Sequence, residues 1–153
     1  MNDAHSIAGI SRLAGEFAWA EDEVCSILAG WIPSIAESDV AAFVGARCHQ
    51  HAWHADLWRD RIASVPGIDP LVLIAPADDV TRTLFSDVAT TESSIERLEG
   101  VYRVLLPRMV SAYRELMSPE NRILDAPTVR IATLVLREEE TDILAAEDLL
   151  RRL

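Results

Sequence analysis

Apolar residues recur at spacings of three and four along almost the whole chain, and very little of it alternates with the period of two typical of a strand. This periodicity predicts four long helices, over about residues 6–35, 38–65, 91–118 and 125–153. It indicates an all-α fold. The 153 residues are 50% hydrophobic and 25% charged, which is enough apolar material for one packed domain over residues 1–153.

Capping residues and prolines place the helix ends. Ser38 and Asp39 are good caps for the second predicted helix, and Thr91 is a good cap for the third. Asp125 is a good cap for the fourth, and a proline follows it in the first turn of that helix. Pro107 lies inside the third pattern, so we expect a kink there rather than two separate helices.

The connections between the predicted helices alternate in length. The first and second helices are joined by a few residues around Glu37, and the third and fourth by a short turn over 119–124. Such short connections force antiparallel neighbours. Between the two pairs lies a long segment, 64–90, which contains three prolines and the pattern of a short helix around 80–88. A short, a long and a short connection in this order are typical of a four-helix bundle with one crossover. The sequence does not decide whether the crossover closes over a cavity as a lid.

The chain is strongly acidic, with 14 Lys and Arg against 25 Asp and Glu and a formal net charge of −11. Such a charge repels phosphate backbones and anionic lipid, so we expect no nucleic-acid partner and no membrane partner. The apolar stretches are too short to cross a bilayer, and the first residues lack the features of a secretory signal. Cys25 and Cys48 are too few for a disulfide scaffold or a structural zinc site, so we expect a reducing, cytoplasmic setting.

Ionisable side chains interrupt the apolar stripe of the second predicted helix. Arg47, His51 and His54 fall in the same sector as its apolar residues, whereas His49 and Asp56 point to the other side. His51 and His54 are three residues apart, which brings both imidazoles to one patch. Such a pair can bind a metal ion, relay protons or make hydrogen bonds within the core.

The first and third predicted helices also bring acids to their apolar sides. Glu16, Glu21 and Glu23 border the stripe of the first helix, and the sequence does not choose among them; Glu21 stands for this helix in the ligand set given below. Glu99 shares the sector of the apolar residues of the third helix. Because an unpaired buried carboxylate costs several kcal/mol, Glu99 needs a donor or a cation, and Arg47 is one candidate.

The charged run of the fourth predicted helix divides between its two sides. Glu140 points outward, Glu138 and Asp142 share the apolar sector, and Glu139 flanks it. All four helices therefore carry carboxylate or imidazole groups at or near the inward side. Because buried ionic groups rarely stabilise a fold better than apolar ones do, this accumulation indicates a polar site inside the bundle.

This arrangement resembles the ferritin-like superfamily, the di-iron carboxylate four-helix bundles. In that family the first and third helices each supply a Glu, and the second and fourth each supply a Glu-x-x-His pair. Here His51 stands where the first Glu of such a pair is expected, and Asp142 stands where the last His is expected. The resemblance implies an iron or manganese site with the candidate ligands Glu21, His51, His54, Glu99, Glu139 and Asp142.

The same resemblance implies an oxidase, hydroxylase or oxygenase that acts on a small-molecule substrate. The candidate catalytic residues are His51, His54, Glu99 and Asp142, with Tyr102 and Tyr113 as secondary candidates. Without metal, the same groups could serve as general acid and base in an isomerase or cyclase.

A non-catalytic helical module is a further alternative from a different class. In that case Arg47 would pair with Glu99 and Asp142 in an internal network, and the function would lie in self-association. Trp19 and Trp53 are predicted to point away from the core, which suits a subunit interface. We therefore expect a homodimer.

Overall fold

The computed structural model describes residues 6–64 and 66–153, and within them the chain forms helices and no strand. The predicted all-α class is therefore confirmed. None of the helices in these residues has the length and apolar character needed to cross a membrane. The α-helices are α1 (Ile7–Trp31), α2 (Ser38–Arg59), α3 (Asp79–Ala89), α4 (Ser94–Glu99), α5 (Leu106–Glu115), α6 (Pro119–Leu124) and α7 (Ala126–Leu150).

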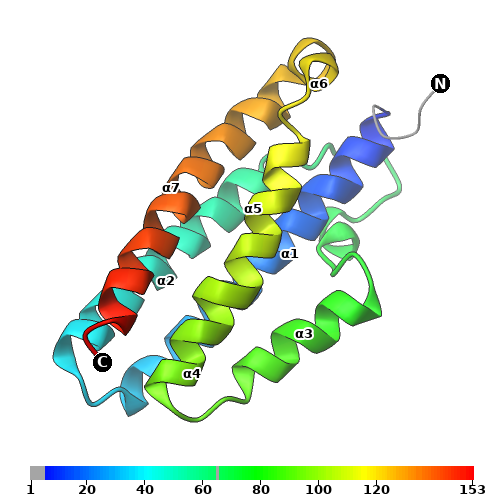
Figure 1. Cartoon of the computed structure of the whole chain (residues 1–153). Helices are drawn as coiled ribbons and strands as arrows, with labels where there is room; N and C mark the ends of the chain where they lie inside the picture. Colours follow the sequence, from blue (N-terminus) through cyan, green and yellow to red (C-terminus); the bar gives the residue numbers. More distant parts are fainter. Residues whose placement is uncertain (1–5, 65) are drawn as a thin grey trace.

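Four long rods lie alongside one another: α1, α2, the continuous rod made of α4 and α5, and α7 (Figure 1). The helix α1 packs along α2, and α5 packs along α7. Within each of these pairs the two helices run in opposite directions, whereas α2 and α5 run in the same direction (Figure 1). The long segment between α2 and α4 carries α3, which lies on the outer side of α1 (Figure 1). The buried residues form one core cluster to which all four rods contribute.

Side-chain caps explain several helix starts. Asp125 caps α7 as predicted, and its side chain accepts a hydrogen bond from the backbone N–H of Thr128. The third rod begins at α4 rather than at Thr91, because Ser93 and Glu96 form a capping box in which each side chain meets the other residue's backbone N–H.

The second rod differs from its prediction at both ends. Glu37 occupies the cap position, so Ser38 and Asp39 belong to the first turn of α2 instead of capping it. The helix ends at Arg59, earlier than the predicted end near residue 65, which lies outside the described residues. Just beyond this end, Arg61 donates hydrogen bonds to side chains at the start of α7, which fixes the direction of the chain as it leaves the helix.

A π-helical turn, Gly100–Leu105, joins α4 to α5 and changes which residues face the core. A π turn holds one extra residue, so a stripe followed back from Tyr113 reaches Leu98 instead of Glu99. Leu98 is 1% exposed, whereas the side chain of Glu99 is 44% exposed and lies 2.6 Å from Arg103. The prediction that Glu99 faces the interior was therefore wrong. Pro107 lies in the first turn of α5, so the irregularity expected at this proline is found in the turn before it.

The predicted short helix in the crossover is present as α3, and it covers a tryptophan that was expected to point outward. The rings of Trp19 and Phe85 on α3 are 5.1 Å apart, so the prediction of an outward Trp19 was wrong. Trp53 is 43% exposed, as predicted. Trp31 and Trp58 are buried in the core, also as predicted.

Candidate metal centre

Four ionisable side chains from three helices meet in the middle of the rods. We call this group the His/Glu centre, and it consists of Glu21 on α1, His51 and His54 on α2, and Glu139 on α7. All four side chains have 0% relative exposure. One potential ligand atom from each residue lies within 4.8 Å of the others. The sequence predicted all four as ligands, and the structure brings them together.

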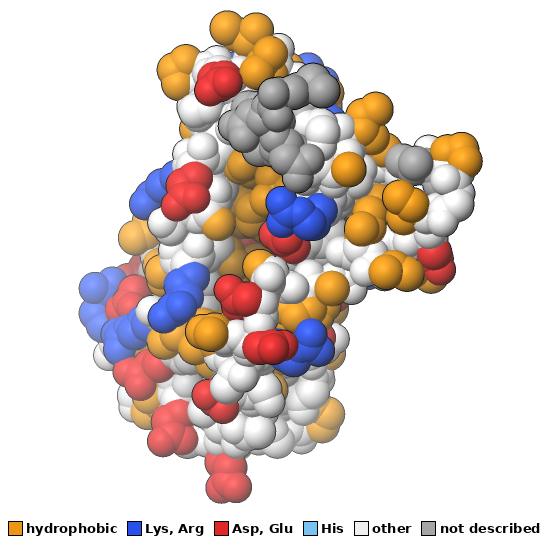
Figure 2. All heavy atoms as spheres, turned by 90° about the vertical axis from the view of Figure 1, so that its right-hand side faces the viewer, with side chains coloured by type: hydrophobic (Ala, Val, Ile, Leu, Met, Phe, Trp, Pro, Cys, Tyr) orange, Lys and Arg blue, Asp and Glu red, His pale blue; other side chains and the backbone are white. Residues whose placement is uncertain are grey.

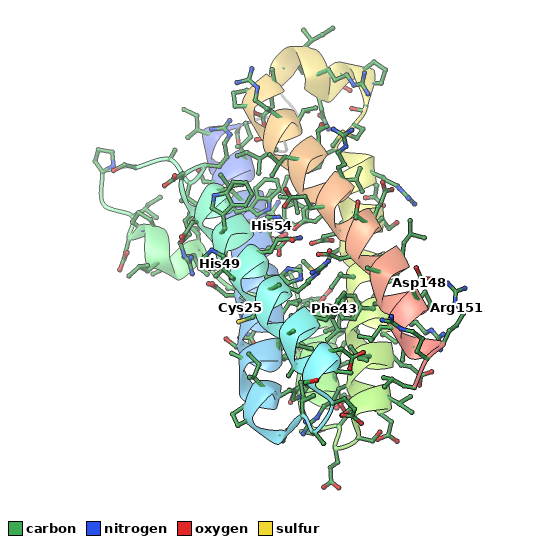
Figure 3. The ribbon with its side chains drawn as sticks, turned by 90° about the vertical axis from the view of Figure 1, so that its left-hand side faces the viewer. Cys25, Phe43, His49, His54, Asp148 and Arg151 are labelled. Carbon is green, nitrogen blue, oxygen red and sulfur yellow. The ribbon has the colours of Figure 1, made fainter. Side chains whose placement is uncertain are left out.

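The spacing of residues on α2 explains how both histidines reach the centre. His51 and His54 are three residues apart and lie on one side of the helix, with ring centroids 5.7 Å apart. His49 lies on the opposite side of α2 and is exposed, as predicted (Figure 3). The same helix therefore offers an exposed histidine that can serve as a matched control.

Glu21 is the hydrogen-bond acceptor that contacts both histidines of the centre. Its Oε1 accepts a hydrogen bond from the Tyr113 hydroxyl at 2.5 Å, and its Oε2 lies 2.6 Å from Nδ1 of His51. The same Oε2 lies 3.4 Å from Nδ1 of His54. Burial raises the pKa of Glu21, but the hydrogen bonds and charges of His51 and His54 outweigh burial and hold this pKa well below its ordinary value. Glu21 is therefore ionised.

His54 is oriented by a carboxylate on α7 that lies outside the centre. Its Nε2 lies 2.8 Å from Oε2 of Glu138, whose side chain is 38% exposed. Burial lowers the pKa of His54, but the hydrogen bonds and charges of Glu21 and Glu138 outweigh burial and raise it. A histidine that binds a metal ion almost always donates its other ring N–H to a carboxylate, a carbonyl or water. Glu138 supplies such a carboxylate, while Nδ1 of His54 faces Glu21.

The centre holds several buried polar atoms that have no hydrogen-bond partner within the described residues. These atoms are Nε2 of His51 and both carboxyl oxygens of Glu139, and Nδ1 of His54 has only its long 3.4 Å ion pair with Glu21. Burial, followed by the negative charges of Glu21 and Asp142, raises the pKa of Glu139 well above its ordinary value. A buried polar group without a partner costs about 1–3 kcal/mol. Unpartnered atoms that converge at one point indicate a place for a ligand that would satisfy them together.

A divalent metal ion fits this donor set. Imidazole nitrogens and carboxylate oxygens are suitable ligands for iron, manganese and zinc. Two atoms that each lie about 2.0–2.2 Å from one ion are at most about 4.4 Å apart, so the observed limit of 4.8 Å requires only small side-chain adjustments. Two carboxylates also neutralise a dication, which removes the penalty of burying a net charge. The residues present can therefore hold a metal ion.

Three predicted site residues are not part of the His/Glu centre. Asp142 and Tyr102 lie beside it, and Glu99 lies away from it. The carboxylate of Asp142 is buried and accepts hydrogen bonds from Arg47 at 3.0 Å and Gln50 at 2.7 Å. Tyr102 is buried, its hydroxyl has no hydrogen-bond partner among the residues that the structure describes, and burial together with the charge of Asp142 raises its pKa. Glu99 lies at the surface, so Arg47 pairs with Asp142 and the expected pairing of Arg47 with Glu99 is absent from the described ion pairs.

Gln50, which donates a hydrogen bond to Asp142 as Arg47 does, was not predicted as a site residue. A signal was present, because Gln50 lies three residues after Arg47 and therefore on a neighbouring part of the same helix side.

A cavity of about 290 Å³ lies between α1, α3 and the rod that contains α5. Its wall is mostly apolar and includes Phe85 and Met109, with Arg108 and Glu16 as charged groups in the lining. The face of the molecule that carries α3 shows hydrophobic side chains gathered among charged ones (Figure 2). Phe17 also lines the cavity, and its ring lies 4.6 Å from that of Tyr113, the residue that donates to Glu21. The rings of Phe17 and Tyr113 thus lie between the cavity and the His/Glu centre.

Comparison with known proteins found no matching family model, no matching curated protein and no matching solved structure. What the His/Glu centre can do therefore follows from its own geometry. That geometry combines an ionised glutamate, a glutamate with a raised pKa, and two imidazoles in one buried group.

Proposed function

We propose that this chain is a metalloprotein that binds one divalent transition-metal ion, iron or manganese, at the His/Glu centre. The observation that carries this proposal is the convergence of buried ligand atoms of His51 and Glu139, which have no partner among the described residues, on Nδ1 of His54 and the ionised Glu21. A centre kept only for stability would not leave these atoms without partners, because each costs free energy. A cation satisfies all of them at once.

We further propose that the four rods form a ferritin-like bundle whose centre is reduced to one metal ion. The direction of the rods and the single long crossover support this assignment. The centre contains only two carboxylates, because Glu99 lies at the surface and the third rod contributes Tyr113 instead. Two carboxylates match the charge of one divalent ion, whereas the two-metal family pattern uses four.

The activity that fits this centre best is that of an oxidase or hydroxylase of a small molecule. Bound iron or manganese supplies redox and Lewis-acid chemistry. The protein's own groups orient the ligands: Glu138 accepts from His54, and Tyr113 donates to Glu21. The cavity lined by Phe17 provides an apolar space for a small, mostly apolar substrate, and the rings of Phe17 and Tyr113 lie between this space and the centre.

Acid–base catalysis without metal is the second candidate, and one observation favours it. The pKa values of Glu21 and Glu139 are displaced in opposite directions within one buried group. Two carboxyl groups held in different protonation states are suited to act as base and acid in an isomerisation. Metal analysis separates this candidate from the first.

The test is metal analysis of the full chain purified without chelator, followed by titration of the chelator-treated protein with Fe²⁺ and Mn²⁺. We expect about one ion per chain, as a four-ligand site predicts, and we expect its loss in His51→Ala and Glu139→Gln. His49→Ala is the matched control on α2, because His49 is exposed on the opposite side of the helix. Glu140→Gln is the control on α7, where the side chain pairs with Arg114 at the surface.

Saturable binding that disappears in the two centre variants and survives in both controls supports the proposal. If no ion binds, or if the His49 and His51 variants bind equally, the metal proposal is wrong. In that event catalysis without metal remains testable through an NMR titration of the two buried histidines.

A further inference from the structure

The two cysteines of the chain form a close pair across the contact between α1 and α2. The Sγ atoms of Cys25 and Cys48 are 3.4 Å apart, and both residues are partly exposed. Cys48 also directs its thiol toward the backbone carbonyl of Cys25 at 3.5 Å. In Figure 3, Cys25 lies at the boundary between the two helices. No other cysteine is present in the sequence, so these thiols have no competing partner within one chain.

We propose that Cys25 and Cys48 are a redox-active dithiol that a hydroperoxide converts reversibly into a disulfide joining α1 to α2. A disulfide bond is about 2.0 Å long, so the two sulfurs must approach by about 1.4 Å. Rotation about the Cα–Cβ bonds moves a cysteine sulfur by this amount. Partial exposure of both residues allows a small oxidant to reach them.

The surroundings of the pair assign different roles to the two sulfurs. Burial, the hydrogen bond with Cys48 and the charges of Cys48 and Asp22 raise the pKa of Cys25 to about 12. Cys25 therefore keeps its proton at neutral pH, and we assign the attack on the peroxide to Cys48. The thiolate of Cys48 attacks the peroxide and becomes a sulfenic acid, and hydroxide leaves. The Cys25 sulfur then attacks the Cys48 sulfur, and water leaves as the disulfide forms.

The reaction balances without any other reactant. Two thiols lose two electrons and two protons, and hydrogen peroxide takes them up to give two molecules of water. A thiol such as dithiothreitol reverses the reaction by exchange.

The pair lies one helical turn from the His/Glu centre but shares no side chain with it. Cys25 follows Glu21 by four residues, and Cys48 precedes His51 by three. Oxidation therefore uses none of the proposed metal ligands. The test is made in the presence of a chelator, so its outcome does not depend on whether the chain binds a metal ion.

The experiment treats the full chain with hydrogen peroxide under native conditions and measures free thiols and intact mass. We expect both thiols to disappear together, with a mass decrease of about 2 Da per chain for two lost hydrogen atoms and full recovery on reduction. Cleavage after arginine separates fragment 13–47, which contains Cys25, from fragment 48–59, which contains Cys48. The oxidised protein should yield these two fragments as one disulfide-linked species.

Cys25→Ser and Cys48→Ser are the matched controls, since each retains one thiol. The Cys25→Ser variant should accumulate oxygen-adduct forms of Cys48. The Cys48→Ser variant should react more slowly, because burial and the charge of Asp22 still raise the pKa of Cys25 after Cys48 is removed. The proposal is overturned if the unmodified chain gains oxygen atoms on both cysteines without the linked fragment. It is also overturned if only a cross-link between two chains forms.

Discussion

Replacing Glu139 by methionine should stabilise the metal-free protein and abolish metal binding. Glu139 is fully buried, and neither carboxyl oxygen has a hydrogen-bond partner within the described residues. Its raised pKa keeps the acid neutral, so no buried cation loses a partner when it is removed. Glu21 retains its contacts with the two histidines and Tyr113. Methionine has a similar length and adapts to irregular space in a core.

The expected gain follows from the penalty that the substitution removes. A buried polar group without a partner costs about 1–3 kcal/mol, and we count this penalty once for the neutral acid. The free energy of unfolding of Glu139→Met should therefore exceed that of the wild type by about 2 kcal/mol. In a chain of this size, such a gain raises Tm by about 4–8 °C.

The gain should increase with pH. Because the pKa of Glu139 in the folded chain is raised above its unfolded value, the folded chain holds a proton here that the unfolded chain releases. The stability that this group contributes is therefore complete below the unfolded carboxyl pKa and is lost as pH rises toward the folded pKa. As pH rises above the unfolded carboxyl pKa, the advantage of Glu139→Met should grow, by at most about 1.4 kcal/mol per pH unit.

The assay is thermal and urea unfolding of wild type and Glu139→Met, with chelator and with Mn²⁺ in excess. Mn²⁺ at about 100 times its Kd should stabilise the wild type by about 2.7 kcal/mol and should leave the variant unchanged. Glu140→Met is the control, because its ion pair with Arg114 is at the surface, where such pairs contribute about 0–1 kcal/mol. A metal-free Glu139→Met that unfolds at a lower temperature than the wild type would refute this reasoning, because Glu139 would then be satisfied by the protein itself.

Three further predictions concern the surroundings of the centre, the crossover and the cysteines. Glu138→Gln should weaken metal affinity about 10- to 100-fold without abolishing it, measured by competition with a chromogenic chelator; unchanged affinity would contradict its orienting role. Gly15→Ala should lower the free energy of unfolding in urea by about 1–3 kcal/mol, because a Cβ at Gly15 would overlap the backbone carbonyl of Leu73, and equal stability would contradict that contact. A disulfide between Cys25 and Cys48, 23 residues apart, should raise Tm by about 6–12 °C, and an unchanged Tm in the oxidised chain would contradict the loop-closure estimate.

Most of the helical framework could be predicted from the sequence because each rod carries its own local signals. The apolar period placed α1, α2 and α7, and the acid at residue 125 marked the start of α7. The same period correctly placed the short helix α3 inside the crossover. Local patterns predicted the ends of helices less well. The helix α2 ends at Arg59, earlier than predicted, and Arg61 just beyond it donates hydrogen bonds to the start of α7.

The candidate site was predictable only in part, because direction around a helix does not say what lies opposite. A rotation of 100° per residue correctly predicted that His51 and His54 face inward. On the fourth predicted helix, however, the same rotation placed Glu138 within the apolar side and Glu139 at its border. In the structure Glu139 is fully buried and Glu138 is partly exposed. Glu99 was misplaced for a different reason, since the count assumed a regular α-helix across the π turn. No local sequence pattern predicted the extra residue of this π turn.

The protonation state of Glu139 links the stability of the fold to metal binding. Without metal, the centre limits its buried charge by keeping a proton on Glu139, whose pKa burial and the charge of Glu21 raise. A bound dication needs both carboxylates ionised, so metal and proton compete for the same group and binding must release a proton. Raising the pH should therefore weaken the metal-free fold while it strengthens metal affinity. Calorimetric titration in buffers of different ionisation enthalpy measures the protons released by Glu139 and His54 together, and binding heats that do not depend on the buffer would show that Glu139 releases no proton to a metal ion.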